Sequence, residues 1–187
     1  MQILVFQGSP RMGGNTARMC EAFAEGARAA GHTVHVLDVA NMNIASCKGC
    51  LSCHPEASAE ADGGLEVSLA PSDGMCAIED DMEQIYSLWH EVEMMVFATP
   101  IYYGSPTPDI LKVLHRSIAK FKPAKVSKTA LFLTSLYEDV YHAARYVYHG
   151  YIQGYFDAED MGVYTYAGTD EVPAEKLSEL RSLGKSL

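Results

Sequence analysis

The fold is decided by residues 3–16, which read Ile3-Leu4-Val5-Phe6-Gln7-Gly8-Ser9-Pro10-Arg11-Met12-Gly13-Gly14-Asn15-Thr16. The first four residues form a short apolar run, as expected of a strand that is buried on both faces of a sheet. Gly8-Ser9-Pro10 ends the run, and small and polar residues then lead to the start of a helix. This stretch predicts a strand, a ligand-binding loop and a helix in direct succession.

The helix that follows has one apolar face and a defined end. Its apolar positions recur at steps of three and four residues and comprise Met19, Cys20, Phe23, Ala27 and Ala30. Gly31 stands where a glycine commonly follows the last helical residue. Residues 34–37, Val-His-Val-Leu, predict a second strand. A strand, a helix and a strand of this kind form the unit from which parallel sheets are built.

The alternation continues to the end of the chain. Further strands are predicted at 94–98, 130–133 and 162–167, with Thr99-Pro100 ending the first of them. Helices are predicted to begin after Asp80-Asp81, at Thr107-Pro108 and at Pro173, and a fourth to extend over 140–151 with Val140, Ala144, Val147, Tyr148 and Tyr151 inward. The pattern predicts one α/β domain over 1–187, a doubly wound five-stranded parallel sheet with helices on both faces.

The composition is that of an ordinary globular protein with an acidic balance. Hydrophobic residues make up 48% of the 187 residues, charged residues 20%, and the formal net charge is -10. This charge argues against nucleic acid or an anionic membrane as a partner of the whole surface. No apolar run approaches the roughly 20 residues that span a bilayer, and the first residues lack the pattern of an export signal. We therefore expect a cytoplasmic protein, in which cysteines are thiols or metal ligands rather than disulfides.

The loop at residues 8–16 has the chemistry of a phosphate site. Ser9, Asn15 and Thr16 offer hydroxyl or amide donors at a helix N-terminus, and Arg11 adds a positive charge. The sequence has no Gly-x-x-x-x-Gly-Lys-Ser/Thr pattern, no Gly-x-Gly-x-x-Gly after the first strand, and no cysteine six residues before an arginine. ATP, dinucleotide and cysteine-phosphatase loops are thereby excluded. The alternative is a simple tight turn with Arg11 in solvent.

A second loop is expected at the same edge of the sheet. Residues 99–106 read Thr-Pro-Ile-Tyr-Tyr-Gly-Ser-Pro and place two aromatic side chains and a glycine after the third strand. Aromatic surface and backbone donors suit a flat ligand with a polar rim. The alternative is that Tyr102 and Tyr103 pack beneath the loop.

Three stretches together resemble a known family: Gly8-Ser9-Pro10-Arg11 with Gly14-Asn15-Thr16, Pro100-Ile101-Tyr102-Tyr103-Gly104, and Asp80-Asp81-Met82. They closely resemble the NADPH-dependent FMN reductase family, which has a flavodoxin-like fold, from Met1 to about Arg116. The resemblance implies that Ser9, Arg11, Asn15 and Thr16 bind the FMN phosphate. It also implies that Pro100, Ile101, Tyr102, Tyr103 and Gly104 flank the isoalloxazine. A third loop, Thr134 to Asp139, departs from the more glycine-rich stretch common in the family.

Four cysteines form a separate feature within a loop excursion at about 45–78. Cys47, Cys50 and Cys53 have the spacing of iron-sulfur ligands, and Cys76 is the natural fourth. The segment 47–53 is similar to the iron-sulfur flavoprotein branch of the family, although residues 55–74 separate Cys76 from the other three. A [4Fe-4S] cluster, zinc and redox-active or free thiols all remain as interpretations. We expect Cys20 to be a buried structural cysteine.

The sequence thus predicts an FMN-dependent NAD(P)H oxidoreductase that reduces a flavin, a quinone or an electron carrier. No side chain is assigned a catalytic role, because a bound cofactor carries this chemistry. The family resemblance implies small-molecule or protein electron donors and acceptors, and a homodimer or homotetramer. The alternative from another class is a non-enzymatic electron carrier resembling flavodoxin, and a third is a binding module that has lost the cofactor.

Overall fold

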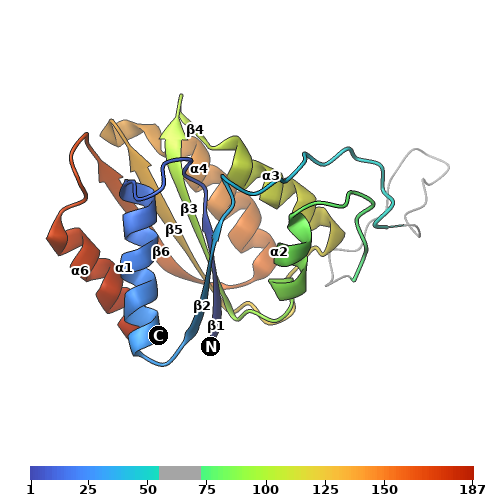
Figure 1. Cartoon of the computed structure of the whole chain (residues 1–187), viewed down its shortest axis with the longest axis horizontal. Coiled ribbons are helices and arrows are strands. Elements are labelled where there is room, and N and C mark those ends of the chain that lie inside the picture. Colours follow the sequence, from blue (N-terminus) through green and yellow to red (C-terminus); the bar gives the residue numbers. More distant parts are fainter. Residues whose placement is uncertain (55–72) are drawn as a thin grey trace.

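A parallel sheet of five strands forms the centre of the computed structural model, which describes residues 1–54 and 73–187 (Figure 1). The strand order is β2-β1-β3-β5-β6, and every pair along it is parallel. These strands are β1 (Gln2–Gln7), β2 (Thr33–Asp38), β3 (Met94–Tyr102), β5 (Lys128–Ser135) and β6 (Glu159–Ala167). The predicted five-stranded α/β fold is confirmed. Of the predicted excursion at 55–74, all but the last two residues lie outside the described residues.

Helices cover both faces of the sheet, as the sequence predicts. They are α1 (Asn15–Ala29), α2 (Met82–Trp89), α3 (Pro108–Arg116), α4 (His142–Val147), α5 (Gly154–Phe156) and α6 (Ala174–Lys185). Shorter turns are η1 (Ser117–Ala119), η2 (Glu138–Val140) and the π-helical η3 (Tyr148–Gln153). The helices α1 and α6 lie on one face, and α2, α3 and α4 on the other (Figure 1). No helix in the described part of the chain is long and apolar enough to cross a membrane.

The apolar run of β1 is divided between the two cores. Ile3 and Val5 pack under α1 and α6, while Leu4 and Phe6 pack under the helices of the opposite face. Successive side chains of a strand point to opposite faces, so a strand covered on both sides must be apolar throughout. Cys20 is fully buried in α1, where burial raises the pKa of its thiol. It is the structural cysteine that the sequence predicts.

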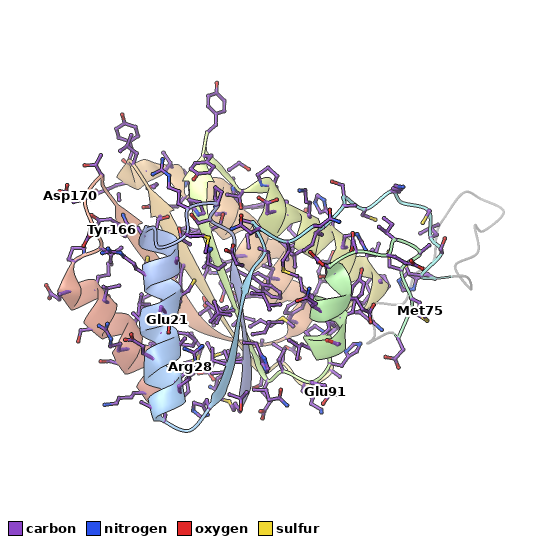
Figure 2. The ribbon with its side chains drawn as sticks, viewed as in Figure 1. Glu21, Arg28, Met75, Glu91, Tyr166 and Asp170 are labelled. Atoms are coloured by element: carbon purple, nitrogen blue, oxygen red, sulfur yellow. The ribbon has the colours of Figure 1, made fainter. Side chains whose placement is uncertain are left out.

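Close contact between α1 and α6 depends on two glycines. A Cβ atom on Gly26 would lie 2.0 Å from the Arg181 carbonyl oxygen, and one on Gly184 would lie 2.3 Å from the Phe23 oxygen. The helices therefore approach each other backbone to backbone. The outer side of α1 is polar, with a 2.9 Å ion pair between Glu21 and Arg28 (Figure 2). Gly31 has a φ of 87°, as predicted for the residue that ends this helix, whereas Ala30 is exposed.

The prediction that Thr99-Pro100 ends the third strand is wrong. The strand β3 continues to Tyr102, and a short strand β4 (Ser105–Pro106) pairs back against it. Ala98 accepts a hydrogen bond from Gly8, so Pro100, two residues on, faces the same side, where β1 has already ended. The missing N–H of the proline therefore interrupts no pairing with β1.

The predicted helix over 140–151 is also different in the structure. It is divided into η2, α4, η3 and α5, and the π-helical part has more residues per turn than an α-helix. From Tyr148 on, the buried positions consequently fall four residues apart, at Tyr148, Ile152 and Phe156. Tyr151, predicted to face inward, is 49% exposed.

Candidate functional site

The carboxyl ends of β1 and β3 meet at one edge of the sheet. The strand β1 lies between β2 and β3, so the order of the sheet reverses direction there. Such a reversal opens a crevice beyond the strand ends, in which α/β proteins commonly bind ligands. The structure thus brings the two predicted loops, residues 8–16 and 99–106, to the same edge (Figure 1).

Direct contacts join the first loop to the residues on either side of the second. The Gly8 N–H donates to the Ala98 carbonyl at 2.8 Å, and the Thr107 hydroxyl donates to the Gly8 carbonyl at 2.9 Å. A Cβ atom on Gly8 would lie 2.3 Å from Cγ1 of Ile110 in α3. The absence of a side chain at Gly8 therefore lets the loop after β1 sit against the start of α3.

Gln7 orients the loop, although the sequence does not single it out. Its amide is 4% exposed and brackets Ser9: the Gln7 nitrogen donates to the Ser9 carbonyl at 3.1 Å, and the Gln7 oxygen accepts from the Ser9 N–H. The Ser9 hydroxyl oxygen accepts from the Arg11 N–H at 3.2 Å. A hydroxyl that accepts in this way still has its own proton to donate. The feature of the sequence that could have indicated this role is a glutamine at the end of an otherwise apolar strand.

Asn15 and Thr16 join the start of α1 to neighbouring loops. The Asn15 amide donates to the Asp170 carbonyl at 2.8 Å and accepts from the Val172 N–H at 3.1 Å. The Thr16 and Thr134 hydroxyls are 2.7 Å apart, which connects α1 to the end of β5. The segment after β6 is tied in further by the Tyr166 hydroxyl, which also donates to the Asp170 carbonyl (Figure 2).

The remaining anion-binding groups of this loop are backbone N–H groups and Arg11. The helix α1 begins at Asn15, and Gly14 before it is only partly exposed, while Arg11 is exposed. The first N–H groups of a helix have no acceptor within it, and they form the positive end of its dipole. The predicted phosphate position therefore faces a helix N-terminus, with Arg11 at its rim.

The second loop presents tyrosines to solvent. Tyr102 pairs with Ser105, so Tyr103 and Gly104 form the turn, with φ angles of 53° and 75°. The Tyr103 side chain is fully exposed, and Tyr102 is 47% exposed. The alternative that both tyrosines pack beneath the loop is therefore wrong for Tyr103. Ile101, in contrast, is buried in the core.

The third loop, after β5, carries two exposed apolar side chains, Leu136 and Tyr137. Its start is fixed by Ser135, whose hydroxyl contacts the Tyr137 carbonyl and the Tyr141 hydroxyl. Burial raises the pKa of Tyr141. The loop thus adds an apolar border beside the Thr134 contact.

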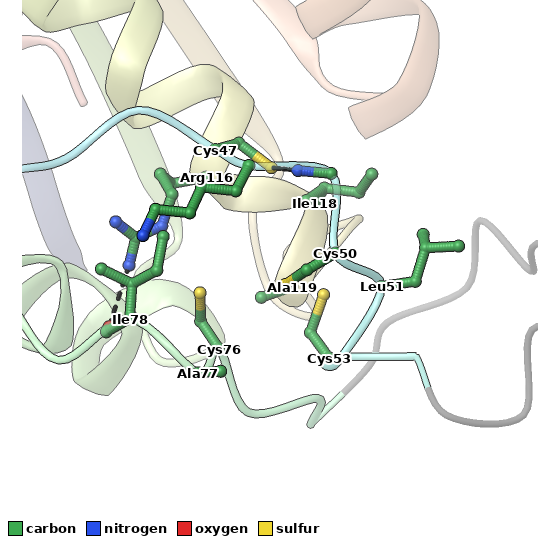
Figure 3. Close-up of a pocket in the computed structure, with 12 residues that line it drawn as sticks. Cys47, Cys50, Leu51, Cys53, Cys76, Ala77, Ile78, Arg116, Ile118 and Ala119 are labelled. Carbon is green, nitrogen blue, oxygen red and sulfur yellow. Dashed lines mark hydrogen bonds between the residues drawn. The ribbon is translucent and has the colours of Figure 1, made fainter.

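A pocket away from the sheet edge is lined by all four predicted cysteine ligands (Figure 3). Cys47, Cys50 and Cys53 come from the cysteine loop, residues 45–54, and Cys76 from the return segment, residues 73–81. The end of α3 and the turn η1 complete the lining. Within 1–54 and 73–187, no three His, Cys, Asp or Glu side chains are placed to hold a single metal ion. A cubane cluster needs a wider arrangement, because each thiolate binds a different iron.

The four thiols influence one another. Burial raises the pKa of Cys53, and the nearby Cys76, Cys47 and Cys50 raise it further. The pKa of Cys50 is lowered by hydrogen bonds from Ser52. In Figure 3 the side chains of Cys53 and Cys76 point to the same side. The four thiols therefore line one pocket, and three of them affect the pKa of the fourth.

The cysteine loop is tightly wound. Gly49 and Leu51 both have positive φ angles, of 64° and 57°. For leucine this conformation is strained, and strain of this kind clusters at functional sites. The winding lets cysteines three residues apart line one pocket.

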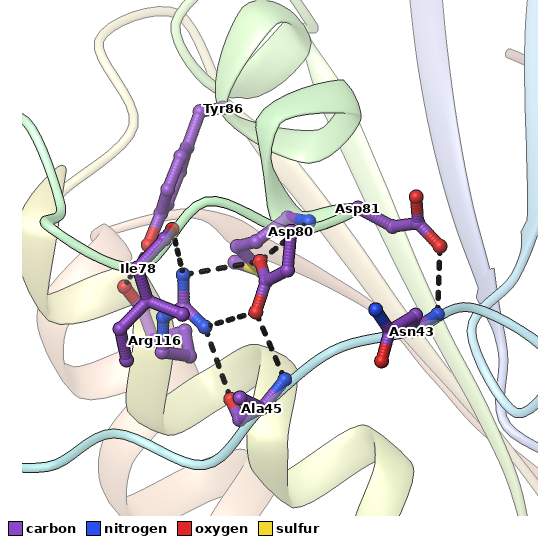
Figure 4. A network of polar contacts seen from close by, with 8 residues as sticks. Asn43, Ala45, Ile78, Asp80, Asp81, Tyr86 and Arg116 are labelled. Carbon is purple, nitrogen blue, oxygen red and sulfur yellow. Dashed lines mark hydrogen bonds and ion pairs between the residues drawn. The ribbon is translucent and has the colours of Figure 1, made fainter.

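A buried ion pair lies behind the pocket (Figure 4). The side chains of Arg116 and Asp80 are 1% and 4% exposed, and Nη1 lies 2.6 Å from Oδ2. Nη1 also donates to the Ala45 carbonyl at 3.0 Å, and Nη2 donates to Asp80 Oδ1 and to the Ile78 carbonyl, both at 3.2 Å. Asp80 Oδ2 accepts from the Ala45 N–H at 2.9 Å. The pair thus joins the cysteine loop, the return segment and the end of α3.

The protonation of this pair follows from its contacts. Burial alone would raise the pKa of Asp80, but hydrogen bonds from Arg116 and from the N–H groups of Ala45 and Met82 hold it below its usual value. Burial would lower the pKa of Arg116, but the hydrogen-bonded Asp80 carboxylate and the neighbouring Tyr86 hydroxyl raise it instead. Both groups are therefore charged at neutral pH.

Further contacts fix the end of the cysteine loop to η1, to Phe121 and to the return segment. The buried His54 ring nitrogen Nε2 lies 2.7 Å from the Ile118 carbonyl oxygen, and the ring packs on Phe121 with centroids 4.6 Å apart. A Cβ atom on Gly74 would lie 2.2 Å from the Cys53 carbonyl oxygen. Sequence reasoning missed these anchors and Arg116. An arginine three residues after Val113, on the buried face of α3, was the one signal available.

Comparison with known proteins gives one family match. The model of the NADPH-dependent FMN reductase family matches residues 1–151. The iron-sulfur flavoprotein of Methanosarcina thermophila is 26% identical over 118 residues, which are 63% of this chain and 53% of that protein. The chain spans about half the length of the curated relatives it matches.

Solved structures share the fold at low sequence identity. The NAD(P)H:quinone oxidoreductase from Methanothermobacter marburgensis has a TM-score of 0.67 at 18% identity, with 99% of this chain and 98% of that chain covered. A flavodoxin from the domain Archaea has a TM-score of 0.57 at 15% identity, with 100% and 95% covered. These likenesses show a flavodoxin-like fold.

Proposed function

This chain belongs to the NADPH-dependent FMN reductase family, and from that premise we propose that it is an FMN-dependent NAD(P)H oxidoreductase carrying an iron-sulfur cluster. The observation that carries the FMN assignment is the meeting of loops 8–16 and 99–106 at the point where the strand order reverses. Flavodoxin-like sheets bind ligands at this point.

The phosphate of FMN would be held mainly by backbone donors. The N–H groups at the start of α1 would face the phosphate. The Ser9 hydroxyl oxygen accepts from the Arg11 N–H, so the Ser9 hydroxyl proton is available to donate to the phosphate. Thr16 can donate to phosphate when Thr134 donates to Thr16. Asn15 contributes by fixing the start of α1, since its oxygen and one N–H are already bonded.

The isoalloxazine would lie against the segment from Pro100 to Gly104. Tyr102 and Tyr103 offer exposed aromatic surface there, and the Tyr103-Gly104 turn offers backbone donors. Bound FMN supplies hydride acceptance at N5 and release of electrons singly or in pairs. The protein residues would bind the ring, orient it and leave one face open to a nicotinamide or an acceptor.

The four-cysteine pocket supports the iron-sulfur part of the proposal. It is lined by every cysteine of the chain except Cys20, and Cys76, Cys47 and Cys50 all affect the pKa of Cys53. Thiolates are the usual ligands of iron-sulfur clusters. Cys47, Cys50, Cys53 and Cys76 would hold a [4Fe-4S] cluster, which passes single electrons to or from a partner.

Acceptors of three kinds fit this arrangement: a flavin, a quinone or a small electron carrier. The apolar Leu136 and Tyr137 border the edge where such a molecule would approach the ring. We propose a homodimer or homotetramer as the working form, supported by three neighbouring exposed tyrosines, in which Tyr151 contacts both Tyr146 and Tyr155. Light scattering of the purified protein tests the assembly.

One anaerobic preparation tests the function. Flavin, iron and sulfide per chain are measured together, and NADH and NADPH oxidation is followed with flavin, quinone and ferricyanide as acceptors. Oxidation by the FMN-loaded protein supports the oxidoreductase. A flavin-loaded protein that oxidises neither nucleotide with any acceptor would instead favour the flavodoxin-like carrier.

A further inference from the structure

The buried ion pair between Arg116 and Asp80 includes a hydrogen-bond donor that has no acceptor in the part of the chain that the structure describes. An arginine guanidinium carries five N–H groups, two on each Nη and one on Nε. The four Nη hydrogens of Arg116 are matched by four contacts, two to Asp80, one to Ala45 and one to Ile78. Nε is buried and has no hydrogen-bond partner among the described residues. Buried donors are nearly always bonded, so this one requires an explanation.

Arg116 is also one of the residues that line the cysteine pocket (Figure 3). Building on the cluster in the proposed function, we propose that Arg116 is a positioning residue for it. Its Nη groups hold the two cysteine-bearing segments together, and its Nε–H donates to a sulfur of the bound group.

The contacts explain how one side chain positions four cysteines. Ala45 is two residues before Cys47, and Ile78 is two residues after Cys76, and both carbonyls accept from the same guanidinium. Asp80 also bonds the cysteine loop directly, because its carboxylate accepts from the Ala45 N–H (Figure 4). The two cysteine-bearing segments, separated by 18 undescribed residues at 55–72, are therefore fixed relative to each other by contacts outside that stretch.

A lysine cannot replace this arginine. An ammonium has three donors on one atom and cannot bond Asp80 through two nitrogens, reach both carbonyls and still present an Nε–H. The substitution Arg116→Lys therefore keeps the positive charge but loses the set of hydrogen bonds to Asp80, Ala45 and Ile78. Hydrogen bonds to cluster sulfurs also raise reduction potentials, because they stabilise the more negative reduced form.

The first measurement uses the whole 187-residue chain without metal. A short thiol-reactive bismaleimide is added to wild type, Arg116→Lys and the matched control Arg181→Lys, which alters an exposed ion pair with Glu25. Mass spectrometry then measures the fraction of Cys76 joined to Cys47, Cys50 or Cys53. We expect this fraction to fall several-fold in Arg116→Lys only, because the lost hydrogen bonds no longer hold the two cysteine-bearing segments together.

The second measurement uses protein reconstituted anaerobically with iron and sulfide. An iron chelator is then added, and we expect it to remove iron at least about tenfold faster from Arg116→Lys than from wild type. We also expect the reduction potential of the cluster to be more negative in Arg116→Lys. Asp80→Asn keeps the Nε–H and removes a negative charge, so its potential should shift in the opposite direction. FMN content and circular dichroism establish that each variant is folded, and Asp80→Asn tests the pair if Arg116→Lys does not fold.

The outcomes separate the two proposals. Equal cross-linking, iron loss and potential in wild type and Arg116→Lys overturn the role of Arg116. A wild-type protein that binds FMN but no iron overturns the cluster and with it the Nε–H donor role, and the cross-linking fractions then decide the positioning role alone.

Discussion

The phosphate loop and the cysteine pocket are built in opposite ways. Residues 8–16 form one continuous loop between β1 and α1, and its donors are largely backbone groups at a helix N-terminus. The cysteine pocket takes its lining from the cysteine loop, the return segment and the end of α3. A site made by one turn depends on local conformation, whereas a site made by three segments depends on the contacts that hold them together. Damage to the two sites should therefore be separable.

The largest effect is expected for Asp80→Ala. It leaves Arg116 buried and unpaired, which should lower the free energy of unfolding by about 3–5 kcal/mol. Urea unfolding measures the loss. The control is Glu25→Ala, which breaks the exposed pair with Arg181 and should cost about 0–1 kcal/mol. Similar losses in both variants would contradict a structural role for the buried pair.

Ser9→Ala should act on the phosphate loop alone. A hydrogen bond to a charged group contributes about 1.5–3 kcal/mol, so we expect FMN to bind roughly 10- to 100-fold more weakly. Fluorescence titration with FMN measures this change, and iron content after reconstitution should stay the same. Ser87→Ala, on the exposed surface of α2, is the matched control. Unchanged affinity for FMN in Ser9→Ala would remove Ser9 from the site.

Gly74→Ala should act on the cysteine pocket alone. Its Cβ would lie 2.2 and 2.7 Å from two carbonyl oxygens, of Cys53 and Ala119, which cannot rotate away as a side chain can. We expect a loss of about 1–3 kcal/mol in stability and a lower iron content with FMN binding retained.

Gly8→Ala is the counterpart of that variant in the phosphate loop. Its Cβ would meet chiefly the Ile110 side chain, which can move. We expect weaker FMN binding and unchanged iron content, as read from the same titration and metal analysis. Loss of both cofactors in either variant would show that the two sites are not independent.

The smallest expected effect is a dependence on pH. The pKa of Asp80 is lower in the folded protein than its usual value of 3.8, so the ion pair contributes fully above that value and is lost as pH falls through the folded pKa. The difference in urea midpoint between wild type and Asp80→Asn should therefore stay constant above about pH 4 and narrow as the pH falls below it. A constant difference over this range would contradict the assignment.

The sequence predicted the sheet because the signals for it are local. Buried parallel strands need unbroken apolar runs, such as Ile3 to Phe6, and helices need apolar residues at three- and four-residue steps. Prediction failed where neighbours override the local pattern. Pro100 continues a strand because β1 has already ended beside it, and the π-helical turn at 148–153 moves Tyr151 outward.

The loop at residues 8–16 and the cysteine pocket differ in the same way, since the first depends on local sequence and the second on packing. The sequence by itself predicted the proposed phosphate loop, because consecutive residues at a helix start have a fixed relation to one another. It also supplied the spacing of Cys47, Cys50 and Cys53. Only the tertiary structure brought Cys76 to the same pocket and placed Arg116 in its lining, since the contacts of Arg116 with Ala45 and Ile78 join segments 71 and 38 residues away. Such contacts leave no periodic or local pattern in a sequence, because they depend on how separate elements pack.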